Sequence, residues 1–149
     1  MKTYTLQHKA NLTVLRAKHL GMCFGVRDAI TLAKRVVKSR PLTVLGELVH
    51  NATVLDDLRG EGVQFETLAS DVKTEMVMIT AHGASNRTKV RARESGLKLR
   101  DATCPLVHHA HKQVRQLVED GYHPVVIGRR GHVEVRGLTE DLSEHDVVL

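Results

Sequence analysis

The sequence of 149 residues is poor in aromatic side chains: it has no Trp, two Tyr and two Phe. Proteins that bind single-stranded nucleic acids stack the bases on aromatic rings, so this scarcity argues against such a function. The net charge of +5 still favours an anionic partner. Ten His residues favour a phosphate or diphosphate, because imidazole nitrogens donate hydrogen bonds to phosphate oxygens. We therefore predict a small anionic ligand and no nucleic-acid partner.

Long apolar segments are also lacking. The longest run, Met76–Ala81, has the length of a strand and falls far short of the ~18 apolar residues of a membrane-spanning helix. The N-terminal residues 1–15 contain no apolar core followed by a small-residue cleavage site, so no secretory signal is predicted. We expect no membrane association and a location in the cytoplasm.

Cysteine is scarce, with only Cys23 and Cys104 in the chain. A structural disulfide between them is not expected in a reducing cytoplasm. Isolated cysteines are most often small buried apolar residues, so their number alone predicts no function. The residues around each cysteine must decide between packing and chemistry.

The pattern of apolar residues predicts an alternation of strands and helices. Strands are expected at 12–18, 42–45, 63–65, 76–79, 97–99, 124–127 and 147–149. Helices are expected at 26–37, 52–58, 86–94 and 105–120, with Asn51, Ser85 and Cys104 as N-caps of the last three. Such an alternation favours an α/β fold with a parallel sheet.

Polar clusters follow five of the predicted strands, at the C-terminal edge where open α/β sheets bind ligands. They contain Cys23, His50, His82, Cys104 and His132. A single His at such an edge is usually structural, but two Cys and three His at one edge predict a shared site. Glu134, two residues after His132, is a candidate proton donor.

The identity of the ligand stays open on spacing alone. Zinc fingers have their ligands in close pairs, which the distant Cys23 and Cys104 do not form. Separate cysteines on loops of a larger fold also hold iron–sulfur clusters, which take thiolate ligands. Imidazoles in a positively charged setting suit a diphosphate.

Five segments together resemble one known family. They are GMCFGVRDAI at 21–30, LVHN at 48–51, AHGAS at 81–85, DATCPLV at 101–107 and GHVEVRG at 131–137. In order and spacing they are similar to the LytB/IspH family, the 4-hydroxy-3-methylbut-2-enyl diphosphate reductases of the non-mevalonate isoprenoid pathway. The resemblance extends over most of the chain from about Leu12. Arg129 and Val133 stand where the family pattern has His and Pro.

The resemblance implies repeated parallel-sheet α/β domains around a central 4Fe–4S cluster, with one full domain and part of a second in this chain. Residues 1–23 are then an N-terminal strand and the first cluster-ligand loop. Residues 24–104 are the first α/β domain, and 105–149 are the start of a second, truncated domain. The apolar residues 147–149 read as the start of a buried strand, which agrees with an N-terminal portion.

The resemblance also implies roles for the six site residues. Cys23 and Cys104 match two of the three iron–sulfur ligands of the family, and the third cysteine is absent from this chain. In the family, three histidines hold the substrate diphosphate, and the residues that match them here are His50, His82 and His132. Glu134 matches the acid of the proton relay.

The activity implied by the resemblance is reductive dehydroxylation of 4-hydroxy-3-methylbut-2-enyl diphosphate. The products are isopentenyl and dimethylallyl diphosphate, and a ferredoxin or flavodoxin supplies the electrons. Two alternatives are a catalytically inactive diphosphate-binding module and a truncated product without a function.

Overall fold

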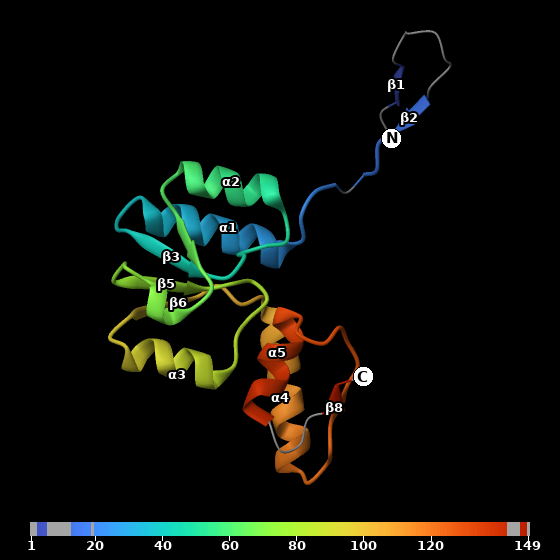
Figure 1. Ribbon diagram of the computed structural model, residues 1–149. Helices are drawn as coiled ribbons and strands as arrows, with labels where there is room; N and C mark the ends of the chain where they lie inside the picture. Colours follow the sequence, from blue (N-terminus) through green and yellow to red (C-terminus); the bar gives the residue numbers. More distant parts are fainter. Residues whose placement is uncertain (1–2, 6–12, 19, 143–146, 149) are drawn as a thin grey trace.

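A short hairpin begins the computed structural model, which describes residues 3–5, 13–18, 20–142 and 147–148. Its strands β1 (Thr3–Thr5) and β2 (Thr13–Leu15) pair antiparallel. The hairpin lies away from the other elements (Figure 1), and Val14 and Leu15 are exposed. Of the strand predicted at 12–18, residues 13–15 therefore form β2 outside the main sheet, and Leu12 lies outside the described residues.

A four-stranded parallel sheet forms the centre of the fold. Its strands, in the spatial order β4-β3-β5-β6, are β4 (Gln64–Glu66), β3 (Leu42–Leu45), β5 (Met76–Ile79) and β6 (Lys98–Asp101). All three pairings are parallel. All four residues of the central strand β5 are buried, as its uninterrupted apolar sequence predicts. The predicted α/β class with a parallel sheet is confirmed.

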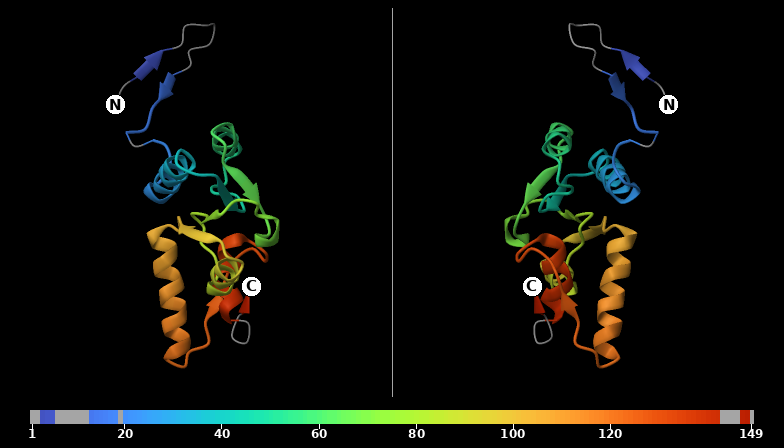
Figure 2. Two further views of the ribbon diagram at one scale, coloured as in Figure 1. Left: turned by 90° about the vertical axis from the view of Figure 1, so that its left-hand side faces the viewer. Right: turned by 90° about the vertical axis from the view of Figure 1, so that its right-hand side faces the viewer.

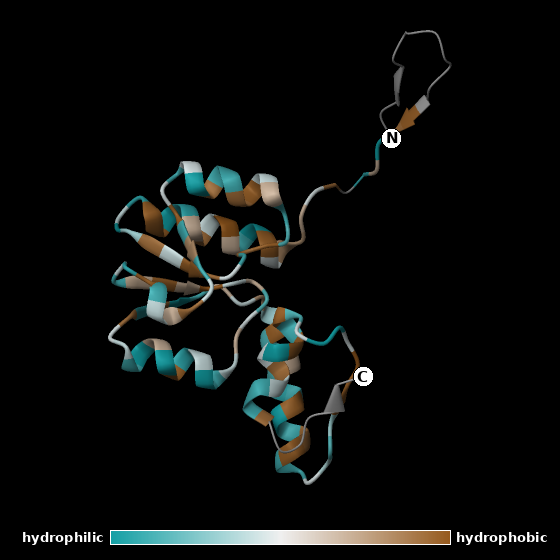
Figure 3. Ribbon diagram, in the orientation of Figure 1, coloured by the Kyte–Doolittle hydropathy of each residue, from teal (hydrophilic) through white to brown (hydrophobic). Residues whose placement is uncertain are grey.

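Helices cover both faces of this sheet. Helices α1 (Phe24–Val37) and α2 (Ala52–Gly60) lie on one face, and α3 (Asn86–Glu94) lies on the other (Figures 1 and 2). Apolar residues run through β3 and recur along α1 between polar ones (Figure 3), which is the pattern of a helix with one buried face. The core between α1, α2 and the sheet includes Ala29, Ala33, Val44, Leu55, Leu58 and Met78.

The three predicted N-cap residues are confirmed, while α1 begins at Phe24, two residues before the predicted start. The Asn51 side chain accepts a hydrogen bond from the amide of Val54 at 3.1 Å, and the Ser85 hydroxyl accepts one from the amide of Thr88 at 3.0 Å. Each bond satisfies an N–H group that the first helical turn leaves without a partner. Cys104 precedes α4 (Pro105–Glu119), whose first residue is the proline.

The C-terminal part adds α4, β7 (Val125–Val126), α5 (Val133–Thr139) and β8 (Val147–Val148). β7 and β8 pair parallel in a separate two-stranded sheet. α4 and α5 lie side by side, away from α1 and α2 (Figures 1 and 2). The helix α5 is absent from the sequence prediction, which places no element between 128 and 137. Two 3-10 turns complete the described elements, η1 (Ala69–Asp71) and η2 (Glu140–Leu142).

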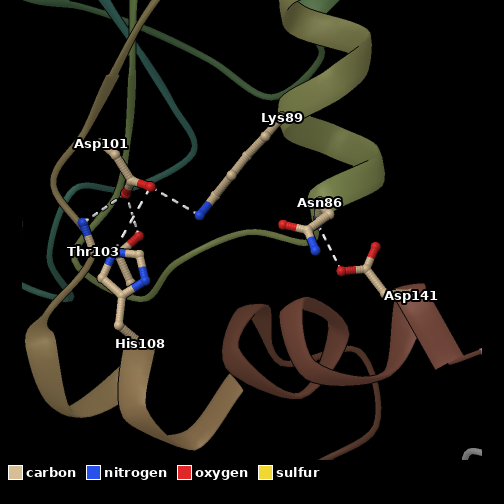
Figure 4. Close-up of polar contacts among 6 residues, drawn as sticks. All are labelled: Asn86, Lys89, Asp101, Thr103, His108 and Asp141. Atoms are coloured by element: carbon tan, nitrogen blue, oxygen red, sulfur yellow. Dashed lines mark hydrogen bonds and ion pairs between the residues drawn. The ribbon is translucent and has the colours of Figure 1, made fainter. Parts of the chain in front are cut away.

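Acidic residues of η2 bind the start of α3. The Asp141 carboxylate accepts a hydrogen bond from the backbone N–H of Asn86 at 2.7 Å (Figure 4). It accepts a second one from the backbone N–H of Arg87 at 3.0 Å. The Ser85 hydroxyl donates to Glu140 at 2.6 Å. A carboxylate at a helix N-terminus satisfies free N–H groups and lies at the positive end of the helix dipole. These contacts fix α5 and η2 against the sheet domain.

Candidate functional site

The three predicted histidines lie together at the C-terminal edge of the sheet. His50 follows β3, His82 follows β5, and His132 is the N-cap residue of α5. The ring centroids of His50 and His82 are 4.1 Å apart in a stacked arrangement. The His132 ring is 5.4 Å from that of His50 and 6.4 Å from that of His82. Segments far apart in the sequence therefore bring three imidazoles to one place.

Carboxylates orient two of these rings. Nδ1 of His82 is 3.0 Å from Oε1 of Glu134, and Nδ1 of His50 is 3.1 Å from Oε2 of Glu47. The His82 side chain is only 12% exposed, and its Nε2 atom is buried without a hydrogen-bond partner among the described residues. A buried nitrogen that is left free in this way is a candidate ligand-binding atom. Glu47 is a member of the site that the sequence analysis missed.

His132 has a different hydrogen-bonding pattern. Its Nδ1 atom accepts the backbone N–H of Glu134 at 3.3 Å. Nδ1 is therefore the acceptor, and Nε2 of the neutral ring carries the proton. His132 thus presents a donor to a ligand even without a positive charge.

The two cysteines lie close to each other at the starts of α1 and α4. Cys23 is the N-cap residue of α1 and Cys104 that of α4, and neither side chain makes a capping hydrogen bond. Both are free thiols, Cys23 exposed and Cys104 partly buried. A Cβ atom on Gly25 would lie 2.5 Å from Sγ of Cys104, so the Cys104 side chain rests against the backbone of α1, two residues from Cys23. Each sulfur also lies at the positive end of a helix.

Backbone hydrogen bonds connect the cysteine and histidine segments. The amide of Cys104 donates to the carbonyl of Ala81 at 3.0 Å, and the amide of Ala81 donates to the carbonyl of Leu48 at 3.3 Å. Ala81 precedes His82, and Leu48 is two residues before His50. These bonds continue the pairing of the sheet beyond the ends of its strands and hold the three loops in register.

Asp101 shapes the turn that leads to Cys104. Its Oδ1 atom accepts the amide of Thr103 at 3.0 Å and the Thr103 hydroxyl, and Lys89 Nζ lies 2.8 Å from Oδ2 (Figure 4). His108 Nε2 lies 3.8 Å from the same Oδ2 atom. Asp101 is not among the site residues predicted from the sequence. The Asp-x-Thr pattern before a helix was the available signal, because an Asp side chain commonly binds the amide two residues on.

We expect Asp101 to make the stability of the chain depend on pH. Burial raises the pKa of Asp101, but hydrogen bonds from Lys89 and Thr103 outweigh it, and the pKa falls below the ordinary 3.8. The folded state thus binds this proton less readily than the unfolded state, so the stabilisation is present above pH 3.8 and is lost as the pH falls below it. Asp101→Asn should lower the free energy of unfolding by about 1–2 kcal/mol at pH 7.

Urea unfolding at pH 7 and at several values below 3.8 checks this prediction. The difference between the wild type and Asp101→Asn should shrink as the pH falls below 3.8. Asp28→Asn, an exposed change on α1, is the matched control and should show no such convergence. A difference that stays constant with pH would contradict the assignment.

A cavity of about 370 Å³ lies beside the histidines, with His50 as the one histidine among its lining residues. Its wall also includes Glu47, Arg91 and Arg136. The volume is in the range of small-molecule sites.

Within the described ranges, no three His, Cys, Asp or Glu side chains form a group that could hold a metal ion. Cys23 and Cys104 are therefore a pair of potential ligands rather than a complete site. In the same part of the chain, no helix has the length and apolar character needed to cross a membrane.

Comparisons with known proteins give a consistent result. The family model described as LytB protein matches residues 14–149. A curated relative from Brevibacillus brevis, named 4-hydroxy-3-methylbut-2-enyl diphosphate reductase, is 35% identical over an alignment of 144 residues. The match covers 90% of this chain and 46% of the relative. A relative of the same name from Azoarcus sp. is 40% identical over 130 residues, covering 85% of this chain and 42% of the relative.

Solved structures agree with these relatives. The Plasmodium falciparum E-1-hydroxy-2-methyl-but-2-enyl-4-diphosphate reductase matches with a TM-score of 0.82 and 32% identity, over 87% of this chain and 42% of that protein. A second structure, of the (E)-4-hydroxy-3-methyl-but-2-enyl diphosphate reductase described as the terminal enzyme of the non-mevalonate pathway, matches with a TM-score of 0.76 and 34% identity. This match covers 89% of the present chain and 49% of the second structure. The chain thus spans less than half the length of each of the two relatives and two solved structures.

Proposed function

The chain belongs to the LytB protein family, and from this premise we propose that it is the N-terminal portion of a 4-hydroxy-3-methylbut-2-enyl diphosphate reductase. The proposed reaction removes the allylic hydroxyl group of the substrate as water. It consumes two electrons and two protons and yields isopentenyl or dimethylallyl diphosphate. The names of the curated relatives support the reaction, and the cluster of three imidazoles supports the substrate class.

The observation that carries the proposal is the proximity of three imidazole rings, those of His50, His82 and His132. A diphosphate offers several anionic oxygens, and imidazole N–H groups bind such oxygens with charge-assisted hydrogen bonds. His82 has a buried, unpartnered Nε2 atom, and His132 has a donor at Nε2. We assign these three residues to the diphosphate.

Glu134 is proposed as the proton donor. Its carboxylate lies 3.0 Å from His82 and remains 45% exposed, so it can exchange protons with solvent while His82 holds it in place. A general acid has to combine a fixed position with access to protons. We propose that Glu134 delivers a proton to the departing hydroxyl group or to the allylic carbon.

Cys23 and Cys104 are proposed to bind two irons of a 4Fe–4S cluster. The fit is partial: two neighbouring free thiols at positive helix ends suit an iron–sulfur cluster, but such a cluster takes more cysteine ligands than this chain has. When bound, the cluster supplies the electrons of the reduction. The family resemblance adds a ferredoxin or flavodoxin as the electron donor to this proposal.

The domain boundaries are also part of the proposal. Residues 24–104 form the first α/β domain, which agrees with a four-stranded sheet contained in 42–101. Residues 105–149 belong to a second domain, which agrees with the separate pairing of β7 and β8. Residues 1–23 supply the N-terminal strand and the loop of Cys23. The cytoplasmic location and the absence of a nucleic-acid partner stay predictions from the sequence.

Binding of inorganic diphosphate to the purified chain tests the proposal. We expect calorimetric titration to show binding, and His50→Ala to weaken it by about tenfold, because the variant removes a donor to an anion. His109→Ala, an exposed histidine on α4, is the matched control and should bind as the wild type does. Absence of binding by the wild type, or equal affinities for both variants, would contradict the assignment of the histidines to the diphosphate.

A further inference from the structure

His111 is a buried histidine outside the site described above. It is the one buried residue of α4, with 9% of its surface exposed. Its Nε2 atom is buried without a hydrogen-bond partner among the described residues. An unpaired buried nitrogen costs free energy, so apolar packing alone would favour a leucine at this position.

The distal edge of the His111 ring lies between two glycines. A Cβ atom on Gly137 would be 3.3 Å from Cε1 and 3.5 Å from Nε2 of His111, and a Cβ atom on Gly83 would be 3.4 Å from Nε2. The same Cβ on Gly137 would be 3.7 Å from Cα of Ala84. The ring therefore touches the backbone of the loop after β5 and of α5, at the place where these two segments meet.

Both segments carry a member of the proposed site. Gly83 follows His82 directly, and Gly137 lies three residues after Glu134 on α5, which places it about one helical turn further on. The 3.0 Å contact between His82 and Glu134 thus joins the same two segments that His111 separates. The thickness of the His111 ring consequently affects how far apart these two side chains lie.

We propose that His111 is a positioning residue, whose ring sets the distance between the His82 loop and α5 so that His82 and Glu134 are hydrogen-bonded. This inference deepens the proposed function and rests on it for the ligand. Gly137 is the surface that matches the ring, since the ring atom Cε1 is the nearest atom that a Cβ there would meet. At Gly83 a Cβ would first meet Cγ2 of Thr103 and Cγ1 of Val107, both at 3.1 Å, before Nε2 of His111. Gly83 additionally has a φ of +80°, which glycine adopts without strain.

The ionisation of His111 agrees with this role. Burial lowers the pKa of His111, and the positive charges of Lys89, Arg115 and His108 lower it further, while Asp141 opposes them. The ring is therefore neutral at neutral pH. A neutral ring fits between two backbone segments without the need for a counter-ion.

Single and double variants of the purified chain test the proposal. His111→Ala leaves a gap, and Gly137→Ala adds a methyl group against the ring; each should shift α5 relative to the loop. We expect each single variant to lose the His82–Glu134 hydrogen bond, measured by the ¹⁵N chemical shifts of His82, and to bind inorganic diphosphate about tenfold more weakly. The double variant should recover part of both losses, because the new methyl group occupies part of the gap.

The control and the outcomes separate this inference from the proposed function. Gly60→Ala on α2 adds a methyl group with no atom within 4 Å and should change neither measurement. Loss of stability in the single variants with unchanged His82 shifts and affinity would overturn the positioning role. Wild-type chain that shows the His82–Glu134 bond but binds no diphosphate would overturn the proposed function alone. If His111→Ala does not fold, unchanged His82 shifts in Gly137→Ala still decide against the inference.

Discussion

Replacing Glu134 with Gln should lower turnover by about a hundredfold or more in a protein extended by the C-terminal portion of its relatives. The substrate affinity should change by less than about threefold, because the carboxamide can still bind His82 at the position where the carboxylate lies at 3.0 Å. A carboxamide does not deliver a proton, so the loss falls on the protonation step. Steady-state kinetics with a chemical reductant measures both quantities.

Glu94→Gln, at the exposed end of α3, is the matched control for this change and should retain the wild-type rate. Near-normal turnover of Glu134→Gln would mean that Glu134 is an ordinary loop carboxylate. An extended wild-type protein that binds the substrate without reducing it would favour the alternative function, an inactive diphosphate-binding module.

Gly25→Ala, near the start of α1, should destabilise the fold strongly. The new methyl group would lie 2.5 Å from Sγ and 2.9 Å from Cβ of Cys104, distances that packed atoms do not tolerate. Either Cys104 turns away or α1 moves, and the cost of such overpacking is about 1–3 kcal/mol. We expect a lower midpoint of urea unfolding. We also expect Cys104 to react faster with a thiol reagent, because its side chain becomes more exposed to solvent.

Gly60→Ala is again the appropriate comparison, since it adds the same methyl group to a helix with free space around it. It should be neutral or stabilising by about 0.5–1 kcal/mol, because alanine has less conformational entropy to lose than glycine. Equal stabilities of the two variants and an unchanged rate at Cys104 would contradict the close contact between α1 and Cys104.

Most of the sheet domain was predictable because its signals are local. Apolar runs such as Met76–Ile79 specify buried strands, and cap residues such as Asn51 and Ser85 act within one turn of their own helix. The helix α5 was not predictable in this way, because its sequence VEVRGLT includes a glycine and too few apolar residues for a helical pattern. Contacts from α4 and from η2 to α3 hold it in place, and these join residues far apart in the chain.

The site residues also divide into those with a local sequence signal and those that depend on contacts between distant residues. His50 and His82 were found because they follow β3 and β5, parallel strands that end at one edge of the four-stranded sheet. His132 follows β7 of the separate two-stranded sheet, and the start of α5 brings it to the other two rings. Glu47, Asp101 and His111 were missed, since each acts through a neighbour: Glu47 on His50, Asp101 on the turn before Cys104, and His111 on two glycines. The last contact has no sequence signal, because nothing in a sequence shows which glycines face a given ring.

The hydrogen bonds from Cys104 to Ala81 and from Ala81 to Leu48 have a consequence for the evolution of this edge of the sheet. They use only main-chain atoms, which every residue at these positions supplies except proline as a donor. These two bonds therefore do not depend on which side chains stand at positions 50, 82 and 104. An exchange of the side chain at position 50 or 82, or at position 104 for any residue but proline, leaves the donors and acceptors of this main-chain register in place.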